Sequence, residues 1–148
     1  MNVFIFSFNV NPVSVKAADQ KIAQLNSELS TQKIIQTHCD SYRLCRKVIE
    51  DCKSAKDPKA YRTKHQAEYH LHDSLKKELQ NLGVTKIPSS DKIKKRIENL
   101  ESEQTASVRE KQGLQEKQKL LNTIQQNFNV LLDAPEMQPP LSEKENTL

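Results

Sequence analysis

Three of the four histidines, His65, His70 and His72, lie in the stretch Tyr61 to Gly83, where closely spaced imidazoles could bind a metal ion. A helix turns by about 100° per residue, so His70 and His72 would point roughly 160° apart. His65 and His72 share a helix face but are separated by roughly 10 Å along the axis, whereas zinc ligands lie about 2 Å from the ion. The spacing therefore predicts packing and surface histidines, with no metal and no cofactor.

The three cysteines, Cys39, Cys45 and Cys52, could also bind metal or react as thiols. They lack the paired spacing of two to four residues that is usual in structural zinc sites. Cys45 and Cys52 lie one heptad apart and continue an apolar series, so we expect small buried side chains. An odd number of cysteines argues against a disulfide framework and for a reducing cytoplasm.

Other chemistry has little support in the sequence. The chain has no G-x-S-x-G, no H-E-x-x-H and no glycine-rich phosphate loop. Glu98, Glu101 and Glu103 are close in sequence, but acidic residues on a helix usually form a solvated face. Because no set of side chains meets the geometric requirements of a catalytic site, we expect that the protein is not an enzyme.

The composition indicates the fold that positions these residues. The chain has 148 residues, of which 28% are charged and 5% aromatic, with two glycines and no tryptophan. This composition is typical of long helices and coiled coils. We therefore predict an all-α fold, an elongated helical hairpin or coiled coil of about three helices. No apolar segment is long enough to span a membrane.

Local signals divide the chain into a leader at 1–15, helices at about 16–53, 58–82 and 91–133, and a disordered tail at 134–148. Asp57 and Pro58 suit a helix start, Gly83 suits the position after a helix end, and Ser89 or Ser90 can cap the last helix. The leader is short and irregular or β-like. It could be a strand, a docked extension or an accidental start.

The last helix has an uneven apolar stripe. Ile93, Ile97 and Leu100 are followed by polar residues, and apolar residues return after Gly113. The polar positions are Gln104, Ser107 and Lys111, and the later apolar ones are Leu114, Leu121, Phe128 and Leu132. This pattern predicts packing at both ends of the helix and a solvated or hinge-like middle.

The clustering of basic residues is the one sequence feature that points to a function. The segment from Leu75 to Arg96 contains seven basic residues and only two acidic ones. We call these seven residues the basic corner: Lys76, Lys77, Lys86, Lys92, Lys94, Lys95 and Arg96. Such a cluster could contact nucleic-acid phosphates, although lysines are also ordinary on exposed helices. No aromatic residue lies among them, which weakens any interpretation based on base stacking.

Three segments in order, "THCDSYRLCRKVIEDC", "YRTKHQAEYHLHDSLKKELQNLG" and the stretch from "KIPSS" to "IQQNFNVLLD", resemble the C-terminal helical region of relaxase/mobilisation nucleases. The likeness covers roughly Ile34 to Asp133. It implies a bacterial mobile element and a role near DNA transfer. The nuclease half of that family uses a tyrosine nucleophile and a histidine cluster that binds a divalent metal. Tyr42, Tyr61 and Tyr69 have no such cluster around them, so no catalytic residue is carried over.

The resemblance implies a non-catalytic helical fragment that acts in plasmid or conjugative transposon transfer in the bacterial cytoplasm. The expected partners are other relaxosome or coupling proteins, bound through helical faces, and the DNA backbone. A second copy of the chain is a further candidate partner. The alternative is a free-standing coiled-coil adaptor or structural protein with no DNA role.

Overall fold

The computed structural model describes residues 12–133, and this part of the chain is all-α, as predicted. The described residues form four α-helices and no strand. In chain order they are α1 (Pro12–Asp51), a 3-10 turn η1 (Cys52–Ser54), α2 (Pro58–Lys64), α3 (Gln66–Asn81) and α4 (Ser90–Asp133). None of these helices is both long and apolar enough to cross a membrane.

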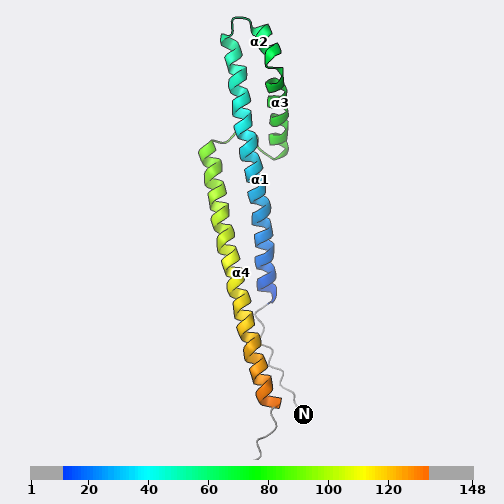
Figure 1. Cartoon of the computed structure of the whole chain (residues 1–148), viewed down its shortest axis with the longest axis vertical. Coiled ribbons are helices and arrows are strands. Elements are labelled where there is room, and N and C mark those ends of the chain that lie inside the picture. The colour runs from blue at the N-terminus through cyan, green and yellow to red at the C-terminus, as the bar shows by residue number, and fades with distance from the viewer. Residues whose placement is uncertain (1–11, 134–148) are drawn as a thin grey trace, which may run out of the picture.

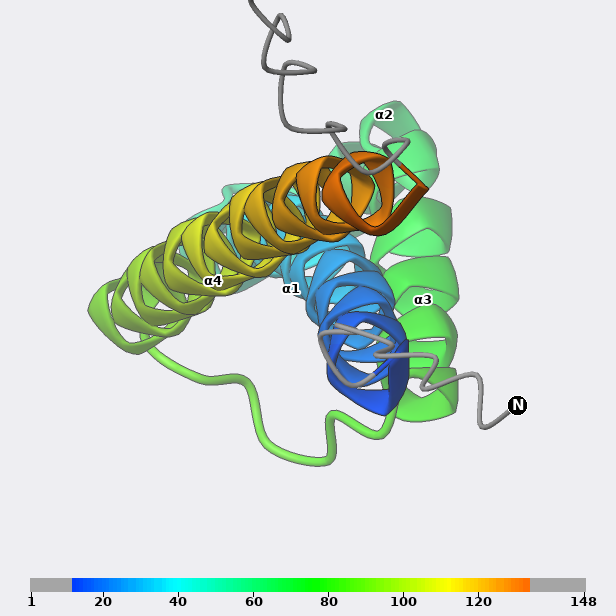
Figure 2. The same cartoon turned by 90° about the horizontal axis from the view of Figure 1, so that it is seen from below.

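The first helix is the central element of an elongated rod (Figure 1). The short helices α2 and α3 lie along its C-terminal half, and α4 lies along its N-terminal half. Both α3 and α4 run antiparallel to α1, on different sides of it (Figure 2). The predicted hairpin is therefore two successive hairpins that share α1.

The core lies where the two hairpins meet. Its buried residues come from three helices, and the loop after α3 covers them in part. The most deeply buried side chains are Cys39, Leu79 and Leu100, one from each of α1, α3 and α4. The remaining buried members are Leu25, Leu29, Ile35, Ile93 and Ile97, with Tyr42, Val84 and Ile87 packed against them. Burial of such side chains stabilises a fold by about 1.5–3 kcal/mol each.

The local signals at the helix ends are confirmed. The Asp57 carboxylate accepts hydrogen bonds from the backbone N–H groups of Lys59 and Ala60, both at 3.1 Å, and Pro58 occupies the first turn. Gly83 has φ of +82°, a left-handed conformation that glycine adopts without steric strain. The Ser89 hydroxyl accepts from the Lys92 N–H at 3.3 Å and caps α4.

The prediction of a single helix over 58–82 is wrong, because the chain breaks at His65. This residue has φ −105° and ψ 26°, outside the helical region, and separates α2 from α3. Its ring lies against Tyr61 with centroids 4.3 Å apart. On the other side, its Nδ1 lies 3.3 Å from the Glu68 carboxylate in the first turn of α3. His65 therefore closes one helix and starts the next.

The boundaries of the first helix also differ from those expected. The predicted leader included residues 12–15, but α1 begins at Pro12, and it ends at Asp51 before the η1 turn. The rest of the leader and the predicted disordered tail, at 1–11 and 134–148, lie outside the described residues. The last helix matches its predicted range within one residue.

The prediction for the middle of the last helix is wrong. Ser107 is buried, with an exposed fraction of 2%, and the Lys111 ammonium lies 2.5 Å from Asp19 of α1. The helix continues through Gly113 without a break. In contrast, its C-terminal end is exposed: Leu132 retains 64% of its surface. Small and polar side chains can be buried in the middle of α4 because α1 lies directly against it. The C-terminal end of α4 extends past Pro12, the first residue of α1, so the described part of α1 does not cover it (Figure 1).

Candidate interaction surfaces

The three clustered histidines contact separate partners. The His72 ring stacks on Tyr42 of α1 with centroids 4.5 Å apart, whereas His65 contacts Tyr61 and Glu68. His70 lies on the exposed side of α3. Within residues 12–133 there is no group of three or more histidine, cysteine or acidic side chains that could bind a metal ion. His65 and His72 instead help to hold the short helices together and to α1.

The cysteines are packing residues in the described structure. Cys39 is fully buried and Cys45 retains 4% of its surface, whereas Cys52 is partly exposed. Burial raises the pKa of the Cys39 thiol, although Arg43 nearby opposes the shift. Burial also raises the pKa of the Cys45 thiol, and the negative charge of Glu68 adds to this effect. Both groups therefore stay protonated and unreactive near neutral pH.

The acidic residues of α4 do not form a purely solvated face. Glu101 forms an ion pair with Lys33 of α1 at 3.1 Å, which sequence spacing could not predict. Glu98 and Glu103 are exposed, as expected.

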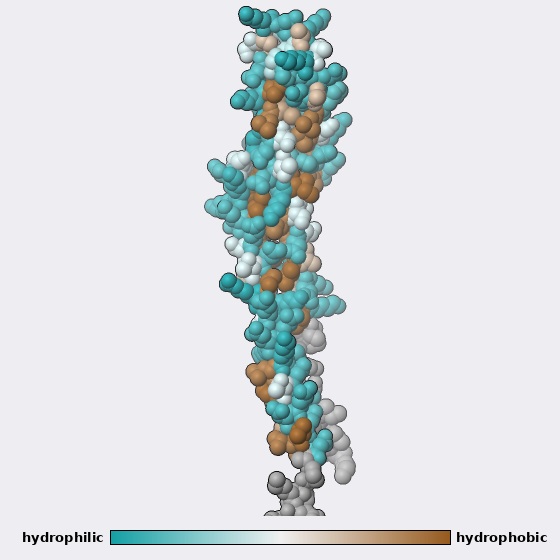
Figure 3. Space-filling view, viewed as in Figure 1, coloured by the Kyte–Doolittle hydropathy of each residue, from teal (hydrophilic) through white to brown (hydrophobic). Residues whose placement is uncertain are grey.

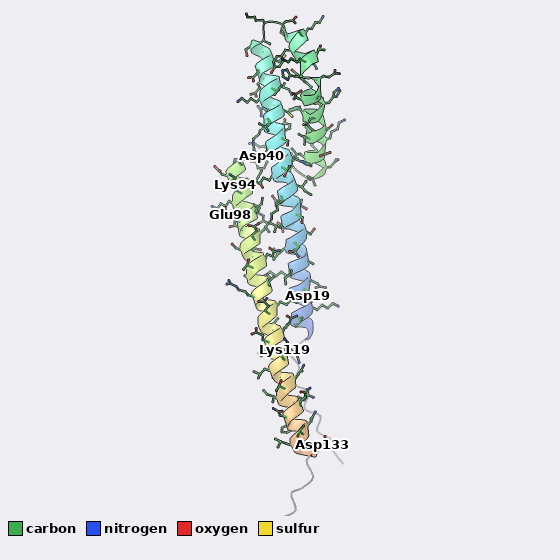
Figure 4. The ribbon with its side chains drawn as sticks, viewed as in Figure 1. Asp19, Asp40, Lys94, Glu98, Lys119 and Asp133 are labelled. Carbon is green, nitrogen blue, oxygen red and sulfur yellow. The ribbon has the colours of Figure 1, made fainter. Side chains whose placement is uncertain are left out.

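Polar contacts between α1 and α4 continue along the shared length of the two helices. Ion pairs join Arg96 to Glu28, Lys33 to Glu101 and Lys111 to Asp19, and Gln104 donates a hydrogen bond to Asn26. Figure 4 shows Asp19 on α1 beside this length of α4. Exposed pairs of this kind contribute at most about 1 kcal/mol each. Their main effect is to fix the antiparallel alignment of α1 and α4.

The basic corner is divided between two sides of the rod. Lys76 and Lys77 lie on α3 and Lys86 in the following loop, whereas the other four residues lie in the first two turns of α4. All seven are exposed. Because α3 and α4 flank α1 on different sides, the corner is not one continuous patch (Figure 2). The prediction that the fold concentrates these charges holds only for the α4 group.

Within the α4 group, side chains point in different directions. Arg96 forms an ion pair with Glu28, so part of the counted charge is neutralised. Lys94 lies on the side of α4 that faces away from α1 (Figure 4). Lys92 and Lys95, the other two residues of the α4 group, border a surface hollow of about 330 Å³. Its lining is Gln32, Pro88, Lys92, Ile93, Lys95, Arg96 and Asn99.

A second exposed surface lies at the C-terminal end of α4, where the sequence predicted packing. Four apolar residues at intervals of four form the distal ridge: Leu120, Ile124, Phe128 and Leu132. Their exposed fractions are 60%, 44%, 39% and 64%. Hydrophobic side chains are visible there at the lower end of the rod in Figure 3. Groups of exposed large apolar residues usually mark interaction surfaces.

Comparison of the chain with protein-family models, with curated proteins and with solved structures gives no significant match.

Proposed function

We propose that this chain is a non-catalytic helical module of a bacterial mobilisation system. It assembles with other relaxosome or coupling proteins through its helical faces. It contacts the DNA backbone through the basic corner, chiefly through the lysines of the α4 group, Lys92, Lys94 and Lys95. The resemblance of residues 34–133 to the helical region of relaxases supports the link to DNA transfer. The side chains of residues 12–133 also support a binding role, because His65, His72 and the two buried thiols pack between helices.

Six exposed lysines at the basic corner support the contact with DNA. Within the described part of the chain, no ion pair involves any of these lysines, which are Lys76, Lys77, Lys86, Lys92, Lys94 and Lys95. Their charges are therefore available to replace the counterions of a phosphate backbone. With no interleaved aromatic residues, this contact reads charge and not base sequence.

DNA binding is tested by fluorescence anisotropy, with a labelled single strand and a labelled duplex. Affinity should fall steeply between about 50 and 200 mM salt. A triple variant, Lys92→Gln, Lys94→Gln and Lys95→Gln, should reduce the slope of log K against log salt by about 0.9 for each duplex phosphate that it no longer neutralises. The matched control removes three exposed lysines near the α1–α2 turn, Lys53, Lys56 and Lys59, with the same change in net charge. Equal effects of the two triple variants would contradict a localised contact.

The link to mobilisation has a separate test. The DNA immediately upstream of the coding sequence should encode a relaxase nuclease half. An unrelated neighbourhood would count against this part of the proposal while leaving DNA binding open.

The distal ridge favours a second candidate function, a free-standing coiled-coil adaptor or structural protein with no DNA role. Its exposed apolar residues would then be the main binding surface. The salt titration separates the two functions, since an adaptor should not bind DNA at any salt concentration.

A further inference from the structure

The surface hollow at the start of α4, which we call the α4 hollow, is built from three separate segments of the chain. Gln32 comes from α1, Pro88 from the loop after α3, and the rest of the lining from the first three turns of α4. Its volume of about 330 Å³ is at the lower end of the range for ligand pockets, about 300–1,000 Å³. The α4 hollow is therefore large enough for one side chain of another molecule and the backbone beside it.

The free charges at the edge of the α4 hollow are positive. Its lining contains no acidic residue, and within residues 12–133 no ion pair involves Lys92 or Lys95. Arg96 also lines the hollow, but its guanidinium is paired with Glu28. Two exposed ammonium groups therefore remain, and they favour a ligand that carries carboxylates or other anionic groups.

The inner surface of the α4 hollow is apolar. Ile93 retains 3% of its surface and lies at the base, and the ring of Pro88 forms part of the wall. The hydrocarbon stems of the long basic side chains add further apolar surface. The lining contains no aromatic residue, so a nucleobase would find no ring on which to stack. An aliphatic side chain fits this surface better, and an apolar centre with a charged rim is the usual arrangement of a protein interface.

Two amide side chains, Gln32 on α1 and Asn99 on α4, also line the α4 hollow. Neither side chain forms a hydrogen bond within the described part of the chain. Each amide offers both a donor and an acceptor, as a peptide backbone does. A bound peptide can therefore pair with both kinds of group, whereas a carboxylate or phosphate can only accept.

We propose that the α4 hollow binds an acidic peptide segment of a partner protein. An apolar side chain of that segment covers Ile93, and neighbouring carboxylates pair with Lys92 and Lys95. This inference rests on the proposed assembly role, and it names the surface and the chemistry of the partner. Because the same two lysines contact the DNA backbone in the proposed function, the peptide and DNA compete for them.

Peptide selection on the full chain tests the proposal, with a phage library of random peptides about 12 residues long, enough for an extended segment. Enriched peptides should combine acidic residues with a large apolar residue. Synthesised with a fluorescent label, they should bind at least about tenfold more weakly to the double variant Lys92→Gln, Lys95→Gln, which lacks both charge-assisted contacts.

The matched control is Lys117→Gln with Lys119→Gln, two exposed lysines further along α4, with the same change in net charge. It should change the affinity less than about twofold, because distant exposed charges are screened by salt. Selection that enriches no acidic and apolar peptides would overturn the proposal, as would equal losses of affinity in the two double variants.

A second variant tests the hollow itself without a change of charge. Asn99 is exposed, and Asn99→Trp places a large side chain in the hollow. The selected peptides should bind this variant at least about tenfold more weakly, since the apolar side chain loses its position. Gln115→Trp, at another exposed amide of α4, should leave their affinity unchanged. Circular dichroism should show the same helix content in both variants. Unchanged binding to Asn99→Trp would overturn the hollow as the binding site.

The result is separable from that for DNA. A chain that binds the selected peptides but no DNA would overturn the DNA contact and leave the peptide site standing. A chain that binds DNA but enriches no acidic and apolar peptide would overturn the peptide site alone.

Discussion

The Arg43 guanidinium lies 3.0 Å from the Ser90 hydroxyl and so joins the C-terminal part of α1 to the first residue of α4. The same guanidinium donates to Asp40 on its own helix at 3.0 Å and to the Pro88 carbonyl in the preceding loop. The Arg43 side chain therefore holds the start of α4, and with it the start of the second hairpin, against α1. Figure 4 shows Asp40 beside the start of α4.

Replacing Arg43 by alanine should lower the free energy of unfolding by about 1.5–3 kcal/mol, the usual contribution of hydrogen bonds from a charged group. Urea unfolding followed by circular dichroism measures this decrease. Lysine at the same position should not restore the stability, because a single ammonium cannot reproduce the fork of the guanidinium. Arg46→Ala is the control: its ion pair with Glu50, at 3.0 Å, is exposed, and its removal should cost no more than about 0.5 kcal/mol. Equal decreases for the two arginines would show that the contacts of Arg43 with Ser90 and Pro88 stabilise the fold no more than an exposed ion pair does.

The core at the junction of the hairpins should dominate stability. Leu100 retains 1% of its surface and packs in the cluster formed by α1, α3 and α4. Leu100→Ala should therefore cost about 2–5 kcal/mol, because apolar burial is reduced and a cavity is left behind. Leu44→Ala, at a leucine 69% exposed, should change stability by less than about 0.5 kcal/mol. Urea midpoints of the two variants give the comparison.

The features that were predicted correctly are those decided within a few residues. The cap formed by Asp57 and the turn at Gly83 depend on short-range hydrogen bonds and on the conformational freedom of glycine, and both can be inferred from sequence. The break at His65 was missed because no proline or glycine marks it, and the seven-residue spacing of Tyr61, Glu68, Leu75 and Leu82 runs through it. Only the ring contact with Tyr61 and the link to Glu68 indicate the change of direction, and both depend on the folded geometry.

The features that could not be predicted depend on where α1 ends relative to α4. Ser107 appears polar and solvated in sequence, but it is buried because α1 lies against it. Leu132 was expected to pack and is exposed, because the described part of α1 does not extend that far. The charge of Arg96 was counted as free, whereas Glu28 lies far away in sequence and neutralises it. A heptad pattern indicates a packing face but not the length of its partner.

The three thiols should differ in reactivity. Cys39 and Cys45 are buried and their pKa values are raised by that burial, so they should react slowly with a disulfide reagent in the folded protein at pH 8. Cys52 is partly exposed and should react first, giving about one fast equivalent per chain. Denaturation should release all three. Three fast equivalents under native conditions would contradict the buried positions of Cys39 and Cys45.

The same pKa shifts predict a loss of stability in alkali. A thiol whose pKa is raised on folding stabilises the fold below its unfolded pKa, about 8.5, and this contribution is lost as the pH rises through the folded value. The free energy of unfolding should therefore decrease above about pH 8.5. Cys45→Ala should make that decrease shallower, because one of the two shifted thiols is gone. Guanidinium titrations between pH 7 and 9.5 measure both slopes, and parallel slopes would show that Cys45 does not contribute.

The break between α2 and α3 should make stability sensitive to acid. The pKa of Glu68 is lowered, first by a hydrogen bond from its own backbone N–H and then by the hydrogen bond to His65. A carboxyl whose pKa is lowered on folding stabilises the fold above its unfolded value, about 4.3, and this contribution is lost as the pH falls through the folded value. Glu68→Gln should therefore lower stability at pH 7 more than at pH 3, and His65→Gln should cause part of the same change. Urea midpoints at the two pH values give the result. If Glu68→Gln lowers stability equally at both, the carboxylate does not stabilise the start of α3 through its charge.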